Sequence, residues 1–466
     1  MWKGFQGVRL TRQTLAEMEK PVIARVNGDC VGFGQSIMFG CDLIVAREHA
    51  VVADVHMDLQ KIFGFDTVPG DGGGALVPLH MFPAKAMEYL LLAKPCTAAE
   101  LARMGAINYA VPPEAATASP TPTSDQEPRL RAIVYTRPGT SDVLSLAERD
   151  VPEPGPGEVR VRLMRAGVNP TDWRFRVRPL SFDEVTPGQD GAGVVDAVGP
   201  QVADVAVGDR VWLILAQHQK PYGTAAEYVV QPTSHVVPLP DGVSFDVGAS
   251  IGVPALTAHR ALTVHDGGPS HLGPGAMAGL TVLVQGGAGA VGNAAVQLAR
   301  WSGATVVTTV SSARKEALAK AAGAHHVVNY RQGDAESAIR AAAPDGVDVV
   351  VEVAPAQNNA LDLAVLKTGG TVSIYAKHGG DEYSVPLLET YFKNLRYQYL
   401  VLYTLHAEAL ARATGDVTTA IATGGFRVGE DAGLPIHHFP LAEAAAAQDA
   451  VEQGAVGKVL LDVAEA

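Results

Sequence analysis

The sequence predicts an α/β chain of two unequal parts, the larger of which combines a doubly wound parallel sheet with a smaller β domain. Two observations carry this prediction. Between residues 281 and 310 an apolar strand runs into a glycine cluster, a helix and a second apolar strand, which is the order of a dinucleotide-binding unit. Between residues 112 and 128 the chain is rich in proline and polar residues without periodicity, which predicts an extended linker.

The composition limits the choice of partners. The chain has 466 residues, of which 47% are hydrophobic and 18% charged, enough for two or three domains with buried cores. The net charge of -13 argues against nucleic acid, because phosphate binding needs a basic face. There is no run of about 18 apolar residues and no apolar core of a secretory signal at the start, so we expect no membrane span and a cytoplasmic protein.

The three cysteines, Cys30, Cys41 and Cys96, all lie in the front part of the chain and form no CxxC pair. This pattern favours small buried thiols over a disulfide framework or a cysteine-built zinc site.

The glycine cluster has the spacing Gly287-x-Gly289-x-x-Gly292 between the strand and the helix. The first glycine permits a tight turn, the second lets backbone N–H groups approach a pyrophosphate, and the third lets helix and strand pack closely. The phosphate then lies at the positive end of the helix. An unliganded glycine turn is the alternative. The predicted pyrophosphate contacts are Gly287, Ala288, Gly289, Ala290, Val291 and Gly292.

The end of the second strand predicts which dinucleotide binds. An NAD site usually has a carboxylate there, which bonds the ribose hydroxyls. Here the strand is followed by Ser311, Ser312, Arg314 and Lys315, which are two hydroxyls and two cations with no carboxylate among them. These groups suit a 2′-phosphate, so we predict NADPH as the cofactor. The alternative is an exposed basic start to the next helix.

The pattern of strand-like and helical segments in the remaining sequence predicts further divisions of the chain. Strand-like segments such as DGVDVVVEVA alternate with helical ones such as RKEALAKAAG, which supports a doubly wound sheet. Short strands with frequent glycine turns precede that unit and predict a compact β domain. The predicted divisions are a front segment at 1–112, a linker at 113–129, a substrate domain at 130–253, a dinucleotide domain at 254–395 and a return to the substrate domain at 396–466.

From about Leu130 to its end the chain resembles the medium-chain dehydrogenase/reductase family, in its zinc-free quinone oxidoreductase branch. The resemblance is carried by AGVNPTDWRFR, PGQDGAGVVDAVG, IGVPALTAHRAL and FPLAEAAAAQDAVEQGAVGKVLLDV. It implies a Rossmann nucleotide domain and a GroES-like substrate domain. Zinc members carry a cysteine in the segment that residues 169–172 occupy here, and His-Glu where this chain has Gln189-Asp190. We therefore expect no metal.

The resemblance also implies further cofactor contacts. Lys315 precedes Tyr330 by fifteen residues, which is the family's spacing between a lysine and a tyrosine on the adenosine phosphate. An ordinary strand-end aromatic is the alternative for Tyr330. The other implied contacts are Thr257 in the segment that leads into the nucleotide domain, Tyr375 and Lys377 in a loop at the nicotinamide, where Lys377 replaces a usual asparagine, and Lys458 near the C-terminus.

The implied reaction is hydride transfer from NADPH to a small quinone or α,β-unsaturated carbonyl held in an apolar slot, with a proton from solvent or a polar side chain. Our candidates to line the slot are Asn169, Asp172 and Tyr222. The alternative for Asn169 and Asp172 is that they fix the loop by turn hydrogen bonds. Family members are commonly dimers, so we expect a homodimer through the nucleotide domain.

The front segment resembles the middle of the enoyl-CoA hydratase/isomerase (crotonase) family. KPVIARVNGDCVGFGQSIMFGCDLIVA predicts a strand, a glycine turn, a helix and a strand, an order that suits an oxyanion hole. The paired glutamates of the hydratases fall at Ser36 and His56, and Phe33 replaces a central glycine. We predict a partial, crotonase-like α/β segment without hydratase activity. Two alternatives stay open: enoyl-thioester reduction by the back part, and an acyl-CoA-binding or assembly module in front.

Overall fold

The computed structural model describes residues 22–31, 33–53, 77, 86, 89–90, 95–111 and 129–464. The chain divides into two compact units, Met1–Gln126 and Glu127–Ala466. Apart from Arg129, the predicted linker lies outside the described residues. Within the described ranges, no helix has both the length and the apolar character that crossing a bilayer requires.

The larger unit contains a six-stranded parallel sheet in the order β16-β15-β14-β17-β18-β19. The order reverses between β14 and β17, and this is where open α/β sheets bind their ligands. The strands are β14 Thr281–Val284, β15 Thr305–Val310, β16 His326–Asn329, β17 Val347–Glu352, β18 Leu366–Ile374 and β19 Arg396–Tyr399. The helices around them are α10 Ala290–Trp301, α11 Ala313–Ala321, α12 Ala335–Ala342, α13 Pro355–Val365, α14 Leu387–Phe392 and α15 Ala407–Ala422.

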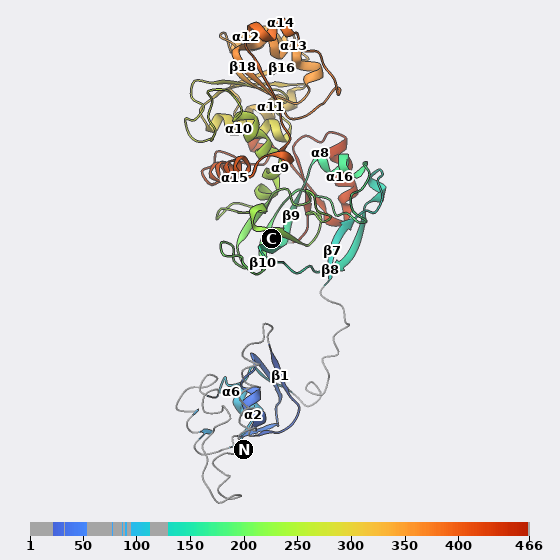
Figure 1. Cartoon of the computed structure of the whole chain (residues 1–466), viewed down its shortest axis with the longest axis vertical. Coiled ribbons are helices and arrows are strands. Elements are labelled where there is room, and N and C mark those ends of the chain that lie inside the picture. Colours follow the sequence, from blue (N-terminus) through green and yellow to red (C-terminus); the bar gives the residue numbers. More distant parts are fainter. Residues whose placement is uncertain are drawn as a thin grey trace, which may run out of the picture. The chain divides into compact units, whose positions relative to one another are not determined.

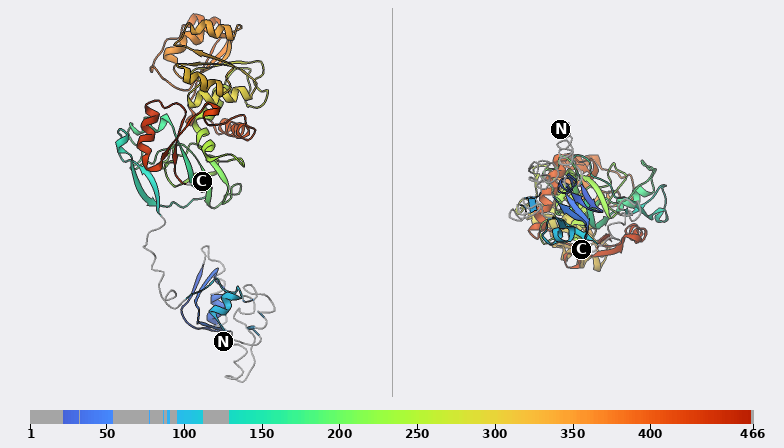
Figure 2. Two further views of the ribbon diagram at one scale, coloured as in Figure 1. Left: turned by 180° about the vertical axis from the view of Figure 1, so that it is seen from behind. Right: turned by 90° about the horizontal axis from the view of Figure 1, so that it is seen from below.

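Both faces of this sheet are buried, as the doubly wound prediction requires. On β14, Val282 and Val284 belong to a core shared with α10 and the linking helix α9 (Phe245–Leu262). Leu283, which points the other way, belongs to a second core shared with α12 and α13. Neighbouring residues of a strand face opposite sides, so the continuous apolar run of β14 serves two helical layers (Figures 1 and 2).

The second part of the larger unit is a seven-stranded, mostly antiparallel sheet. Its long strand β9 pairs with β10, β12 and β21. A separate hairpin, β7 with β8, precedes it. The elements are β7 Arg129–Val134, β8 Ser145–Asp150, β9 Glu158–Val168, α8 Pro170–Arg176, β10 Asp190–Val198, β11 Arg210–Leu213, β12 Tyr228–Pro232, β13 Val236–Pro238, β20 Ile436–Pro440, α16 Ala444–Glu452 and β21 Lys458–Asp462.

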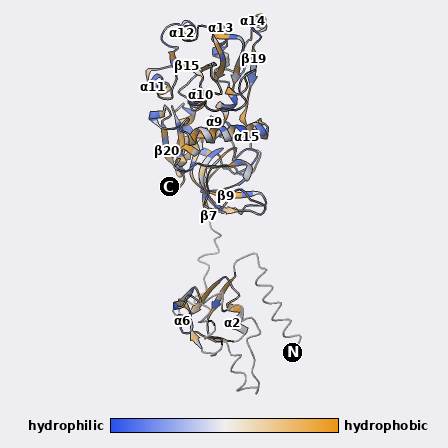
Figure 3. Cartoon of the chain, turned by 90° about the vertical axis from the view of Figure 1, so that its left-hand side faces the viewer, coloured by the Kyte–Doolittle hydropathy of each residue, from blue (hydrophilic) through white to orange (hydrophobic). Residues whose placement is uncertain are grey.

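Helix α9 connects the two sheets and lies between the two lobes in Figure 1. Ser244 caps its start by accepting a hydrogen bond from the Val247 N–H. The helix is apolar along much of its length (Figure 3), and its side chains pack in the same core as β14. A helix that is apolar on most sides is buried between layers.

Two of our domain limits differ from the structure. The limit at residue 254 falls inside α9, because one helix serves both parts of the unit. The limit at residue 396 cuts off β19, which pairs in parallel with β18 and so belongs to the six-stranded sheet. β19 is an edge strand with partly exposed polar and aromatic residues, so its sequence lacks the apolar run of a buried parallel strand.

The front unit has a small core of its own. A parallel sheet joins β1 (Ile23–Val26), β3 (Leu43–Arg47) and β6 (Tyr109–Val111). The predicted strand, turn, helix and strand correspond to β1, the short strand β2 (Cys30–Val31), α2 (Phe33–Met38) and β3. β2 pairs with β4 Val51–Ala53, which pairs with β5 Cys96–Thr97, and α6 Ala98–Arg103 follows β5.

Candidate functional site

The candidate cofactor site is the carboxyl edge of the six-stranded sheet. Its strands are parallel, so the loops that follow them meet at one edge. These loops contain most of the residues that the sequence singled out for the cofactor; Thr257 in α9 and Lys458 in β21 are the exceptions. The loops begin at Gln285 after β14, Ser311 after β15, Tyr330 after β16, Tyr375 after β18 and Leu400 after β19.

The glycine loop after β14 uses four glycines. Gly286 has φ +73° and makes the tight turn that we had assigned to Gly287. Gly287 is needed for another reason, because a Cβ there would overlap the Thr308 hydroxyl. A Cβ on Gly292 would overlap the carbonyl of Gly286, which is the close packing predicted for the third glycine. A Cβ added to Gly289 would make only an ordinary van der Waals contact, 3.5 Å from the Gly286 carbonyl oxygen.

The start of α10 presents backbone donors next to Gly289. The first intrahelical hydrogen bond runs from the Asn293 N–H to the Gly289 carbonyl, at 2.7 Å. The N–H groups of Ala290, Val291 and Gly292 therefore precede the helical hydrogen-bond ladder. Together with the positive end of the helix dipole, these donors fit a phosphate group.

The basic segment after β15 lies beside the loop after β16. The Tyr330 N–H donates to the Val310 carbonyl at 3.1 Å, so Tyr330 lies beside the end of β15. Ser312 caps α11 by accepting a hydrogen bond from the Lys315 N–H. In the described part of the chain, neither Arg314 nor Lys315 forms an ion pair, and Arg314 is exposed. Tyr330 thus lies beside the strand end that leads to Arg314 and Lys315, for which no ion-pair partner is found among the described residues.

The loop after β18 contains Tyr375 and Lys377. The Tyr375 N–H donates to the Glu352 carbonyl at 3.1 Å. Burial, and then the charge of Glu352, raise the pKa of Tyr375, so its hydroxyl stays protonated at neutral pH. The Lys377 ammonium forms an exposed ion pair with Asp381, four residues along the same loop. Thr257, the remaining predicted contact, is buried in α9.

Helix α8 of the seven-stranded part contacts the segment that follows β19. Tyr403 donates to the Thr171 hydroxyl at 3.1 Å, and its ring lies 6.0 Å from Phe175 and stacks at 5.3 Å on His218. Sequence reasoning did not single out Thr171, His218 or Tyr403. Thr171 lies inside the NPTDW motif and could have been singled out. His218 lies in a loop and Tyr403 in a short 3-10 helix (Leu402–Thr404), and neither belongs to a sequence pattern that points to a site.

A buried polar cluster of Asn169, Asp190 and Lys458 lies at the start of α8. The Lys458 ammonium is 2.8 Å from Asn169 Oδ1 and 3.3 Å from Asp190 Oδ2. Asp190 also accepts hydrogen bonds from Asn169 Nδ2 at 2.7 Å and from the Val253 N–H of α9 at 2.8 Å. Lys458 is 2% exposed and its charge is paired, so the structure does not offer it to a cofactor phosphate.

The position where zinc relatives carry His-Glu is therefore filled by this cluster, with a resident ammonium beside Asp190. In the described parts of the chain, no group of three or more His, Cys, Asp or Glu side chains is arranged to hold a metal ion.

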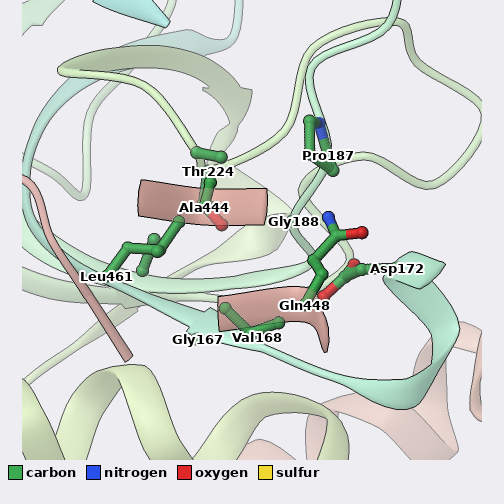
Figure 4. Close-up of a pocket in the computed structure, with 11 residues that line it drawn as sticks. Gly167, Val168, Asp172, Pro187, Gly188, Thr224, Ala444, Gln448 and Leu461 are labelled. Carbon is green, nitrogen blue, oxygen red and sulfur yellow. The ribbon is translucent and has the colours of Figure 1, made fainter. Parts of the chain in front are cut away.

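Asp172 lies in the first turn of α8 and accepts the Asn169 N–H at 2.7 Å. It lines a small pocket with Gly188, Thr224, Leu461 and Gln448, with room for about one water molecule (Figure 4). Burial raises the pKa of Asp172 to about 7, against the opposing effect of the Asn169 N–H.

Asn169 and Asp172 are both 2% exposed, so the loop-fixing alternative describes them better than direct contact with a substrate. Tyr222 is 39% exposed, but the Arg149 guanidinium lies 3.3 Å from the centre of its ring.

Comparison with known proteins agrees with this architecture. Residues 155–241 match the alcohol dehydrogenase GroES-like domain, and residues 290–415 match the zinc-binding dehydrogenase family. The quinone oxidoreductase of Rattus norvegicus is 31% identical over 341 residues, which are 71% of this chain and 97% of the rat protein.

The chain belongs to the medium-chain dehydrogenase/reductase family. Within the family, its relatives place it in the quinone oxidoreductase branch. The structure of Escherichia coli quinone oxidoreductase complexed with NADPH is 25% identical with a TM-score of 0.60, covering 71% of this chain and 99% of that one. An NAD-dependent alcohol dehydrogenase structure is 31% identical with a TM-score of 0.62, covering 72% and 100%. Residues 6–119 match the enoyl-CoA hydratase/isomerase family.

The first prediction concerns the buried ion pair. Lys458→Met leaves the Asp190 carboxylate buried without its cation, so we expect the free energy of unfolding to fall by about 3–5 kcal/mol in denaturant titrations. The control is Lys320→Met, which removes an exposed partner of Glu316 and should cost about 0.5 kcal/mol or less. Equal losses of unfolding free energy in the two variants would contradict the assignment of Asp190 and Lys458 as a buried ion pair.

The second prediction concerns pH. The pKa of Asp172 is raised in the folded state, so its stabilising contribution is fully present below pH 3.8 and is lost as pH rises through about 7. Asp172→Asn removes this dependence but keeps an acceptor for the Asn169 N–H. The stability of the wild type relative to the variant should fall by up to about 1.4 kcal/mol per pH unit from about pH 5 to about pH 7. Parallel stability curves would show that Asp172 does not titrate in this range.

Proposed function

We propose that the chain is an NADPH-dependent oxidoreductase that transfers a hydride to a quinone or an α,β-unsaturated carbonyl without a metal. One observation supports the choice of cofactor: the end of β15, where an NAD site has a carboxylate, is followed by Arg314 and Lys315, which form no ion pair within the described part of the chain. The relatives named quinone oxidoreductase support the choice of acceptor.

The residues at the carboxyl edge fit a bound dinucleotide in order along the sheet. The donors of residues 290–292 would hold the pyrophosphate, and Gly289, which has no side chain, would let it approach the backbone. Ser311, Ser312, Arg314, Lys315 and Tyr330 would surround the 2′-phosphate. Tyr375 and Lys377 would lie at the nicotinamide end, which supplies the hydride when the cofactor is bound.

The acceptor would lie between the loop after β18 and the aromatic contacts of α8. Tyr403, Phe175 and His218 give this place flat apolar surfaces that suit a quinone ring. Burial lowers the pKa of His218, so its ring is neutral at pH 7 and bonds without adding charge. We assign Asn169 and Asp172 the role of holding α8 in place. The proton would come from solvent or from a hydroxyl of this cluster.

The direct test measures NADPH oxidation by the purified full-length chain with a simple benzoquinone, an enone and an enoyl-CoA thioester, before and after treatment with a chelator. Turnover with quinone or enone that survives the chelator supports the proposal. Turnover with the thioester alone supports the enoyl-thioester reductase alternative, and no turnover with any acceptor contradicts both.

The third prediction addresses the cofactor preference. Lys315→Ala removes one cation from the proposed phosphate site, so the KM for NADPH should rise about tenfold while the KM for NADH stays unchanged. Lys320→Ala on the same helix is the matched control, because Lys320 pairs with Glu316 and should leave both values unchanged. A rise in KM for both cofactors, or for neither, would remove the 2′-phosphate site from Lys315.

The front unit is proposed to lack hydratase activity. Ser36 stands where one catalytic glutamate is expected and is fully buried in α2, while His56 lies outside the described residues. A serine hydroxyl cannot act as the paired carboxylate in activating water.

The fourth prediction follows from the division into two units. A chain starting at residue 127 should keep its kcat/KM for NADPH and quinone within about twofold, because all proposed contacts lie in the larger unit. The full chain should not hydrate crotonyl-CoA. A tenfold loss on deletion, or measurable hydration, would assign the front unit a catalytic part.

The homodimer stays a prediction. The surface that we propose for it is the edge of the six-stranded sheet, where α14 exposes apolar side chains. These are Leu387, Leu388, Tyr391 and Phe392.

A further inference from the structure

Two carboxyl groups are buried together behind the glycine loop. Glu352 ends β17 and Asp362 lies on α13, and both are fully buried. They lie close enough to hydrogen-bond to each other, and no cation is among the groups that act on Asp362. Two carboxylates in contact inside a protein cannot both stay ionised, because each charge raises the cost of the other.

The hydrogen bonds show where a shared proton would sit. Glu352 Oε1 accepts from the Ala354 N–H and from Asn358 Nδ2, and Asp362 Oδ1 accepts from Gln285 Nε2 at 2.7 Å. The second oxygens, Glu352 Oε2 and Asp362 Oδ2, receive no donor from the residues that the structure describes. One proton between them would satisfy both oxygens. Burial, and then the charge of Glu352, raise the pKa of Asp362 well above its ordinary value.

A directional chain of hydrogen bonds leads from Asp362 to the glycine loop. The acceptor Asp362 Oδ1 requires the NH₂ group of Gln285 to face it, so Gln285 Oε1 faces the other way. Gln285 Oε1 accepts from the Thr309 hydroxyl at 2.6 Å. Because the Thr309 hydroxyl donates its proton to Gln285, its oxygen can only accept, and it accepts a hydrogen bond from the Gly286 N–H at 3.2 Å.

Gly286 is the residue with φ +73° that turns the chain from β14 into the loop. Its neighbour is held by the same strand, since the Gly287 N–H donates to the Thr309 carbonyl. Gln285 and Thr309 are each 2% exposed, so water cannot readily replace either partner.

We propose that Asp362 is a positioning residue for the dinucleotide loop: it shares a proton with Glu352 and, through Gln285 and Thr309, holds the Gly286 amide in place for cofactor binding. This inference rests on the proposed function only for its effect on the cofactor. Its effect on the loop itself belongs to the protein without ligand.

Because the pair depends on a shared proton, cofactor binding should be sensitive to alkaline pH. Loss of the shared proton leaves two adjacent buried charges, which would push Asp362 and Glu352 apart and disturb Gln285. The other titratable side chains around the pair are Tyr375, which feels Glu352, and Tyr383 and Tyr397, which feel Asp362. Their pKa values are raised, so they stay neutral and add no further negative charge around the pair.

The experiment compares Asp362→Ala with Asp362→Asn. The alanine removes the acceptor for Gln285, whereas the asparagine can accept from Gln285 and donate to Glu352 Oε2 without a titrating proton. Asn359→Ala is the matched control. Asn359 lies one turn away on α13 and bonds Tyr397 and the Ser384 carbonyl, away from the loop.

Two readouts are taken on full-length protein. Hydrogen exchange of the amides of residues 285–292 is measured by mass spectrometry without cofactor, and Kd for NADPH is measured by nicotinamide fluorescence. We expect Asp362→Ala to speed hydrogen exchange in the loop and to raise the Kd for NADPH about tenfold. A tenfold rise corresponds to about the net free energy of one hydrogen bond. Asp362→Asn should stay within about twofold of wild type, and Asn359→Ala should change neither readout even where it lowers Tm.

The pH profile separates positioning from packing. From neutral to alkaline pH the Kd of the wild type should rise more steeply than that of Asp362→Asn, because only the wild type loses the shared proton. Wild-type loop exchange in Asp362→Ala, or the same pH profile in Asp362→Asn and wild type, would overturn the proposal. If the wild type binds neither NADPH nor NADH, the proposed function fails, and the exchange comparison still decides whether Asp362 holds the loop.

Discussion

The contact on which the rest of the site depends is the buried ion pair of Asp190 and Lys458. Asp190 accepts hydrogen bonds from Asn169 at the start of α8, from Val253 in α9 and from Lys458 at the start of β21. One carboxylate thus joins four elements, including the helix that packs against the six-stranded sheet. A buried ion pair contributes little net stability compared with apolar packing. Removing one of its two charges is costly, however, because the other charge is left buried without a partner. The pair therefore favours the one arrangement of these four elements in which both charges meet.

Two glycines let these elements meet around Asp190. A Cβ on Gly167 would come within 3.0 Å of both Asp190 Cβ and the Lys458 ammonium. Gly252 leaves room for the Asp190 carboxylate against α9. With both positions small, α8 can begin close to the carboxyl edge of the parallel sheet. Thr171 and Phe175 then reach Tyr403, so the acceptor site that we propose would draw residues from both parts of the unit.

The sequence predicted the features that local pattern determines. The strand, glycine turn, helix and strand around residues 281–310 follow the fingerprint, and the cations after β15 lie at the strand end as expected. The pattern could not distinguish Gly286 from Gly287, because both are glycine and only the backbone angle and the contact with Thr308 separate their roles. The edge strand β19 escaped notice because it has no apolar run.

Long-range contacts account for what sequence reasoning missed. The burial of Lys458 depends on Asn169 and Asp190, each more than two hundred residues earlier in the chain. The stacking of His218 on Tyr403 and the pairing of Glu352 with Asp362 join segments that no short motif connects. Such contacts follow from the topology of the fold rather than from local propensity.

We propose that the carboxyl edge of the six-stranded sheet binds NADPH in preference to NADH. The most direct measurement is an equilibrium titration of the full-length chain with each cofactor, followed by the fluorescence of the reduced nicotinamide. We predict saturable binding of both cofactors, with NADPH at least about tenfold tighter because Arg314 and Lys315 would lie at its 2′-phosphate. Equal affinity, tighter binding of NADH, or no binding of either cofactor would contradict it.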